Sequence, residues 1–161
     1  MNIDKEVKRK EKIGRDLFTK YLSKKNFDIH FNPNMFDHFD VCFRSFNNPV
    51  LKNYAEIKVR SEKYTVNNLS GSTILEKVKL DYFIKLHQLE PDSKFWYINF
   101  FSNGILIFDL TNRIINKDWM IEQNEYRSNN SESYYSTKSV CFLAFNDKKN
   151  KDWLIVDELS L

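Results

Sequence analysis

The sequence predicts a mixed α/β fold with a mixed sheet: a helix, three strands, a second helix and two further strands, with extra strands near the C-terminus. Three patterns predict this order. Apolar residues recur at helical spacing over residues 4–25, strict alternation marks residues 54–60, and two apolar runs flank Ser102-Asn103-Gly104. The 161 residues and 42% hydrophobic content fit a single domain, with a core over about residues 4–110 and an extension over about 111–161.

Turn residues divide the first part of the chain into one helix and three strands, expected over residues 4–25, 27–32, 36–46 and 54–60. The turns are Pro33-Asn34 and Asn47-Asn48-Pro49. The second strand is expected to place Phe39, Val41 and Phe43 on its apolar face, and Asp40 therefore points to the opposite face.

A second helix is expected after the polar stretch at residues 67–71. Thr73-x-x-Glu76 has the form of a capping box, which predicts that Ser72 or Thr73 caps this helix. Pro91 is expected to end it.

The apolar runs at residues 94–101 and 105–110 predict two strands, and their near-continuous hydrophobicity indicates burial on both faces. The last third of the chain carries weaker patterns. They indicate, in order, a short helix, a polar loop and two strands, over residues 116–123, 127–138, 140–145 and 153–159.

Charge and composition restrict the class of protein. The net charge of +3 permits a polyanionic partner without requiring one. Cys42 and Cys141 lie inside apolar segments, which indicates reduced thiols rather than a disulfide framework. No apolar stretch approaches the roughly 20 residues that span a bilayer, and the N-terminus lacks the apolar region of a signal peptide, so a cytoplasmic protein without a membrane partner is expected.

Asp40, Glu56 and Lys58 are the candidate catalytic residues. Alternation over residues 54–60 puts Glu56 and Lys58 on one face and Ile57 on the other. A strand that folds back antiparallel brings both side chains near Asp40. Two carboxylates and a lysine at one point can perform metal-dependent phosphodiester hydrolysis. The alternative is that Glu56 and Lys58 form an ordinary surface ion pair on an unrelated α+β protein.

The element order, together with Phe39-Asp40-Val41 and Ala55-Glu56-Ile57-Lys58-Val59-Arg60, resembles the PD-(D/E)XK nuclease superfamily and its Holliday-junction-resolvase-type members over roughly residues 4–110. The resemblance implies a restriction-endonuclease-like core and a Mg²⁺-dependent endonuclease that acts on DNA, with Mn²⁺ able to substitute and with room for a homodimer. Resolvase-like relatives often carry Gly-Glu where this chain has Gly14-Arg15-Asp16. At about 100° per residue, Glu11 rather than Asp16 lies on the side of the packing stripe, so Glu11 is preferred as the helix carboxylate and Glu6 is second.

The resemblance also implies roles for the site residues. Asp40 and Glu56 would bind the metal, the Ile57 carbonyl would add a ligand, and Glu11 would act through water. Lys58 would orient or deprotonate the attacking water. Five basic residues are candidate phosphate contacts, with a solvated lysine-rich face as the alternative for each: Lys52, Arg60, Lys63, Lys77 and Lys79.

A second function remains open from the sequence. The same fold can serve as a catalytically inactive nucleic-acid-binding or assembly module, because a fold does not by itself establish chemistry.

Overall fold

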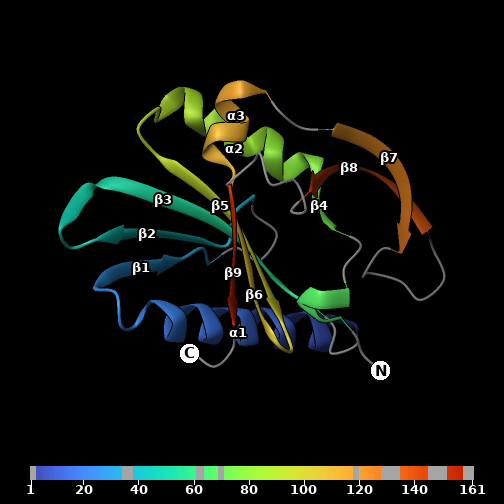
Figure 1. The fold of residues 1–161 in the computed structure, drawn as a ribbon, viewed down its shortest axis with the longest axis horizontal. Coiled ribbons are helices and arrows are strands. Elements are labelled where there is room, and N and C mark those ends of the chain that lie inside the picture. The colour runs from blue at the N-terminus through green and yellow to red at the C-terminus, as the bar shows by residue number, and fades with distance from the viewer. Residues whose placement is uncertain are drawn as a thin grey trace.

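The computed structural model describes residues 3–33, 38–60, 64–68, 71–117, 120–127, 135–144 and 152–157. It confirms the predicted mixed α/β fold, in which helices cover a mixed sheet (Figure 1). The elements are α1 Ile3–Leu22, β1 Phe27–Phe31, β2 Val41–Ser45, β3 Asn48–Val59, a 3-10 turn η1 Val66–Asn68, β4 Ser72–Glu76, α2 Lys77–Leu89, β5 Lys94–Phe101, β6 Gly104–Asp109, α3 Thr111–Asn116, β7 Met120–Arg127, β8 Tyr135–Ala144 and β9 Trp153–Asp157.

The main sheet has six strands in the order β1-β2-β3-β5-β6-β9. β3 and β5 run parallel, and every other neighbouring pair is antiparallel. Two parallel neighbours need a crossover connection, and the segment containing β4 and α2 supplies it. β3 is therefore central, with β2 on one side and β5 on the other.

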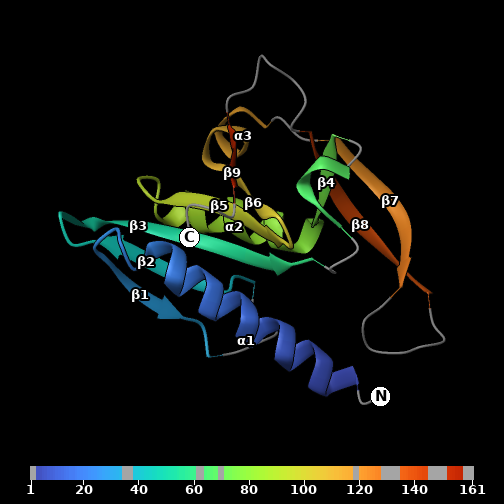
Figure 2. The ribbon, with the colours of Figure 1, turned by 60° about the horizontal axis from the view of Figure 1, so that its bottom comes forward.

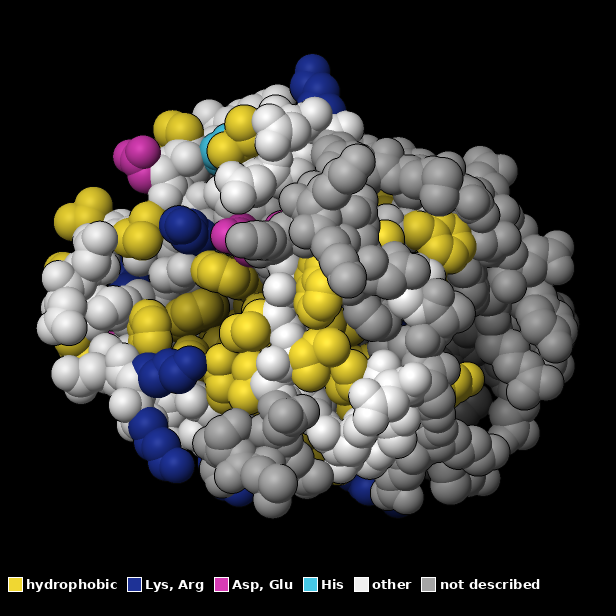
Figure 3. All heavy atoms as spheres, viewed as in Figure 1, with side chains coloured by type: hydrophobic (Ala, Val, Ile, Leu, Met, Phe, Trp, Pro, Cys, Tyr) yellow, Lys and Arg dark blue, Asp and Glu magenta, His cyan; other side chains and the backbone are white. Residues whose placement is uncertain are grey.

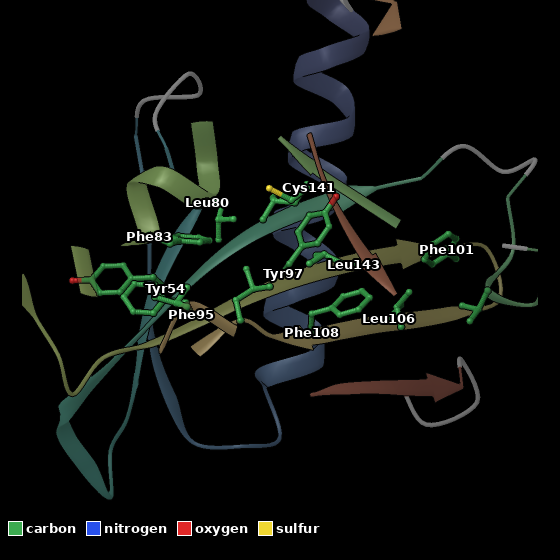
Figure 4. Close-up of a cluster of buried hydrophobic side chains, with 14 residues drawn as sticks. Tyr54, Leu80, Phe83, Phe95, Tyr97, Phe101, Leu106, Phe108, Cys141 and Leu143 are labelled. Carbon is green, nitrogen blue, oxygen red and sulfur yellow. The ribbon is translucent and has the colours of Figure 1, made fainter. Parts of the chain in front are cut away.

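Helices cover both faces of this sheet: α1 lies on one side, and α2 and α3 lie on the other (Figure 1). The predicted alternation of β3 is confirmed, because Ala55 packs with Phe18 of α1 whereas Tyr54 packs with Phe83 of α2. β5 and β6 are buried on both faces, as predicted. Figure 4 shows the α2 side of the core, where Phe95 and Tyr97 of β5 lie close to the helix and to β8.

The predicted apolar face of the second strand is wrong at one position. Val41 and Phe43 join the cluster under α1, but Phe39 packs against the cluster on the other face. The reason is that β2 begins only at Val41, so the chain at Phe39 is no longer held in the alternation of the strand.

The predicted capping box is also wrong. Residues 72–76 form strand β4, and α2 begins at Lys77 with Glu76 as its N-cap residue, whose side chain makes no capping hydrogen bond. Thr73 is buried, and its hydroxyl accepts a hydrogen bond from Arg60. β4 pairs with β8, so its conformation is fixed by a partner far along the chain.

The helix expected over residues 116–123 is wrong as well. The chain forms α3 just before this stretch, and its second half belongs to β7. β7 pairs with β8, and β8 begins at Tyr135, inside the polar loop expected over residues 127–138. The loop residues 128–134 lie outside the described residues. The C-terminal strand is confirmed as β9.

β4, β8 and β7 form a separate three-stranded sheet beside the main one (Figure 2). β9 forms an edge of the main sheet, and hydrophobic side chains gather along the middle of the face that it crosses (Figure 3). Leu154 and Ile155 of β9 are both exposed. Among the described residues, no helix has the length and apolar character needed to cross a membrane.

Candidate active site

Asp40 lies directly before β2, and its backbone and side chain both contact neighbouring chain segments. Its N–H donates to the carbonyl of Ala55 (3.0 Å), and its carbonyl accepts from Asn32 (2.9 Å). The register of β2 and β3 begins with Val41, which pairs with Ala55, and Asp40 lies one residue before it. Asp40 is near enough to Glu56 for the two carboxyl groups to interact. The Ile57 N–H donates to Asp40 Oδ2 at 2.6 Å. If β2 extended further, a backbone carbonyl of that strand would accept the Ile57 N–H. The Asp40 carboxylate accepts it instead, and this hydrogen bond fixes the position of the carboxylate.

Glu56 lies on β3 with its side chain only 14% exposed. Burial and then the neighbouring Asp40 carboxylate raise the pKa of Glu56, against the opposing charges of Lys79 and Lys58, and the result is a pKa of about 8. Burial also raises the pKa of Asp40, against the hydrogen bond from Ile57. The structure therefore places two buried carboxyl groups close enough to interact, and a positive charge between them would be strongly favoured.

Lys79 of α2 supplies one such charge. Its Nζ lies 3.0 Å from Oε2 of Glu56, and the Lys79 side chain is only 16% exposed. The contact is an ion pair, and no donor in the described part of the chain meets this oxygen with normal hydrogen-bond geometry. The charge of Lys79 also acts on Asp40, where it opposes the rise in pKa.

Lys58 shares the face of β3 that carries Glu56. Burial lowers the pKa of Lys58, and the nearby positive charge of Arg60 lowers it further. Glu56, Glu76 and Asp40 act in the opposite direction. An amine whose pKa is lowered in this way accepts and releases a proton nearer to neutral pH than an exposed lysine does.

Glu11 and Glu6 lie on α1, in different surroundings. Glu11 forms an ion pair with Arg15, and Arg15 also donates to the carbonyl of Asn32 at 2.8 Å. Since Asn32 is hydrogen bonded to Asp40, Glu11 connects to the site through Arg15. Glu6 instead pairs with surface residues of its own helix, and hydrogen bonding to Arg9 lowers its pKa.

The four candidate phosphate contacts that the structure describes are not gathered on one surface. Lys52 pairs with Glu90 at 2.6 Å, Lys77 pairs with Asp81 on the surface of α2, and Lys79 lies inside the site.

Arg60 points inward, and Lys63 lies outside the described residues. The Arg60 guanidinium donates to Asn99 at 2.9 Å, to Thr73 at 2.7 Å and to Tyr97 at 2.9 Å. This arrangement ties the end of β3 to β4 and β5.

The donor set fits a hard divalent cation. Within the described ranges, no group of three or more His, Cys, Asp or Glu side chains is arranged around one point. Asp40 and Glu56 nevertheless offer two carboxylates, and Mg²⁺ is usually bound through one or two carboxylates with water and substrate phosphate completing its coordination. Oε2 of Glu56 lacks an aligned hydrogen-bond donor and would be a ligand atom, although the Lys79 ammonium lies 3.0 Å from it.

Sequence reasoning missed two features of the site. Glu76 was expected in the first turn of the second helix as the capping-box partner of Thr73, but it ends β4 and its charge acts on Lys58. Lys79 was expected on a DNA-facing surface, but it pairs with Glu56. A lysine in the first turn of the crossover helix is a weak local signal, because its distance from β3 depends on where β4 ends.

No protein-family model and no curated protein matches the chain. Among solved structures, the chain is similar to Hjc of Archaeoglobus fulgidus, a Holliday junction resolvase from an archaeal hyperthermophile. The two share 14% sequence identity with a TM-score of 0.47, over 81% of this chain and 86% of that chain. At this identity and score, the similarity leaves the function to be argued from the residues of the site.

Proposed function

We propose that this protein is a Mg²⁺-dependent endonuclease that hydrolyses phosphodiester bonds in DNA at a site formed by Asp40, Glu56 and Lys58. The observation that supports this most directly is the pair of buried carboxyl groups, both with a raised pKa, beside a lysine with a lowered pKa. Titratable groups with strongly perturbed pKa values concentrate at functional sites. DNA as the substrate comes from the resemblance of the sequence to PD-(D/E)XK nucleases.

The residues divide the chemical work among them. Asp40 and Glu56 would hold Mg²⁺, with the Ile57 carbonyl as a further ligand and Glu11 acting through water. When bound, the metal lowers the pKa of a water molecule and offsets negative charge on the phosphate. Lys58 orients the attacking water, accepts a proton from it, and stabilises the negative charge that develops on the phosphoryl oxygens.

The remaining basic residues have lesser roles in this proposal. Lys52 and Lys77 are partly exposed and contact the phosphate backbone, which contributes affinity without sequence information.

Cleavage of both strands of a symmetric DNA would require two sites related by symmetry, and therefore a homodimer.

One observation favours the inactive DNA-binding or assembly module instead. The ammonium group of Lys79 already compensates the Glu56 carboxylate, so the site has a counter-charge without any metal. The two functions differ in one measurable respect, because only the nuclease depends on a divalent metal.

The test is cleavage of linear, single-stranded and branched DNA by the purified protein in Mg²⁺, Mn²⁺ or EDTA. Asp40→Asn, Glu56→Gln and Lys58→Met should each reduce the cleavage rate by about 100-fold or more. Asp28→Asn is the matched control, because it makes the same change on β1, where Asp28 pairs with His30 at the surface. Cleavage that survives in Asp40→Asn would exclude this site, and DNA binding without cleavage of any substrate would favour the inactive module.

A further inference from the structure

Lys79 is positioned differently from the other lysines of α2. Its side chain is largely buried and reaches Glu56, whereas Lys77, two residues earlier, pairs with Asp81 at the surface. Lys79 also acts on Asp40, so one ammonium group compensates both carboxylates. The main sheet and the crossover helix thus place a cation of the protein itself beside the two candidate metal ligands.

A buried pair of carboxylates is costly without such a cation. Removal from water disfavours the charged form of each group, and the two negative charges repel each other. An ammonium 3.0 Å from the Glu56 oxygen offsets both costs. In the metal-free protein, Lys79 therefore stabilises the arrangement that a metal would otherwise stabilise.

A divalent cation and this ammonium group cannot both occupy that position at low cost. Two positive charges held this close together repel each other strongly, because the partly buried position screens them less than water does. A metal bound by Glu56 would therefore drive Lys79 away from the carboxylate.

We propose that Lys79 is a displaceable internal counter-ion: it occupies the Asp40–Glu56 carboxylate pair in the metal-free protein, and metal binding displaces it. This inference rests on the proposed function, because it requires that the same carboxylates bind the metal. Lys79 consequently lowers the affinity of the site for a metal ion. In return, it stabilises the folded protein when no metal is bound.

The experiment compares Mg²⁺ affinity by isothermal titration calorimetry at pH 8.5, where protons compete weakly for the carboxylates. Lys79→Met removes the competing charge and should tighten Mg²⁺ binding by about tenfold or more. Lys79→Arg retains the charge in a form that binds carboxylates bidentately, and it should weaken Mg²⁺ binding severalfold. Lys85→Met, the matched control at an exposed position of the same helix, should change the affinity by less than about twofold.

Thermal unfolding gives a readout that does not depend on catalysis. In EDTA, Lys79→Met should lower the midpoint, because the two carboxylates lose their counter-ion. Saturating Mg²⁺ should then raise the midpoint more in Lys79→Met than in the wild-type protein. If Lys79→Met does not unfold cooperatively, the affinity of Lys79→Arg decides: weaker binding supports the proposal, and equal or tighter binding overturns it.

The outcomes separate this inference from the proposed function. Equal or weaker Mg²⁺ binding by Lys79→Met would overturn the role of Lys79, while the wild-type protein could still bind Mg²⁺ through Asp40 and Glu56. Mg²⁺ binding that is absent from the wild-type protein, or unchanged in Asp40→Asn and Glu56→Gln, would overturn the proposed metal site itself, and the role of Lys79 with it.

Discussion

Glu56 shows at the scale of one residue how a buried ionisable group reduces stability. Its carboxyl group is buried beside Asp40, and its pKa rises from an ordinary value of 4.5 to about 8 in the folded protein. Between these two pH values the folded state holds a proton that the unfolded state has released. The contribution of Glu56 to the free energy of unfolding is therefore fully present below about pH 4.5. This contribution is lost as the pH rises towards 8. Asp40 has a raised pKa and acts in the same direction.

Glu56→Gln should remove much of this pH dependence. In EDTA, the free energy of unfolding of the wild-type protein should fall between pH 4.5 and 8, by at most about 1.4 kcal/mol per pH unit from this residue. Glutamine has no titrating proton, so the variant should show a flatter profile. Urea denaturation across this pH range measures the difference, and identical slopes in the two proteins would contradict the raised pKa.

Arg60 illustrates a basic residue with an internal role. It donates to Asn99, Thr73 and Tyr97, and Asn99 is completely buried. Tyr97 in turn donates to the carbonyl of Ile74 at 2.8 Å, so the network joins β3, β5 and β4. Loss of the Arg60 side chain would leave buried polar groups without hydrogen-bond partners.

Arg60→Met should lower the free energy of unfolding by about 2–4 kcal/mol, because an unsatisfied buried polar group costs about 1–3 kcal/mol. Lys52→Met is a suitable comparison, since Lys52 lies on β3, which Arg60 directly follows, and forms a partly exposed ion pair with Glu90. It should cost less than about 1 kcal/mol. Urea denaturation measures both changes. An equal loss in the two variants would show that the Arg60 network contributes no more than a surface pair.

At the scale of elements, the approach of α1 to β3 determines where the site lies. Gly14 is the contact point: a Cβ atom there would lie 3.1 Å from Cγ2 of Ile57 and 3.2 Å from Cγ2 of Val59. The Ile57 N–H donates to the Asp40 carboxylate, so this contact lies one residue from the candidate metal ligand Glu56. The absence of a side chain at Gly14 lets the helix pack closely on the strand that carries Glu56.

Gly14→Val should lower the free energy of unfolding by about 1–3 kcal/mol through overpacking, even though valine favours a helix more than glycine does. It should also reduce Mg²⁺ binding, since β3 would shift under Asp40. Asp16→Val is the matched control on an exposed position of α1, and it should have a small effect because aspartate and valine have similar helix propensities. Thermal unfolding and calorimetry measure the two effects, and an unchanged Gly14→Val protein would contradict the tight contact.

At the scale of the whole molecule, the C-terminal third belongs to the same core as the site. β9 pairs with β6 in the main sheet, and β8 pairs with β4. Cys141 and Leu143 of β8 are buried in the cluster that contains Phe83 of α2. Arg113 of α3 and Asp152 form a buried ion pair, and Arg113 also donates to the carbonyl of Ala144 at 3.1 Å.

A fragment of residues 1–110 should therefore fail to unfold cooperatively, although it contains Asp40, Glu56 and Lys58. It lacks the partner of β4 and the cover of the cluster beside α2, which exposes apolar residues such as Leu75 and Leu80. Circular dichroism melting of the fragment beside the full chain measures this. A sharp transition in the fragment would show that the core of about residues 4–110 is an independent unit.

The sequence by itself determined the parts of this protein that depend on neighbouring residues. Alternation over residues 54–60 assigned Glu56 and Lys58 to one face, and the antiparallel return of that strand predicted that both lie near Asp40. These features follow from the period of a strand and the geometry of an antiparallel pair. The helix α1 was predictable from apolar residues at helical spacing, and the buried strands β5 and β6 were predictable from continuous apolar runs.

Only the tertiary structure decided the features that join distant segments. Residues 72–76 have a sequence compatible with a helix start, and they form β4 because β8 lies beside them, with Glu76 paired to Val140. The end of β4 then fixes where α2 begins, and this brings Lys79 to Glu56. Such pairings are selected by burial and charge compensation in the assembled core, and no local periodicity records them.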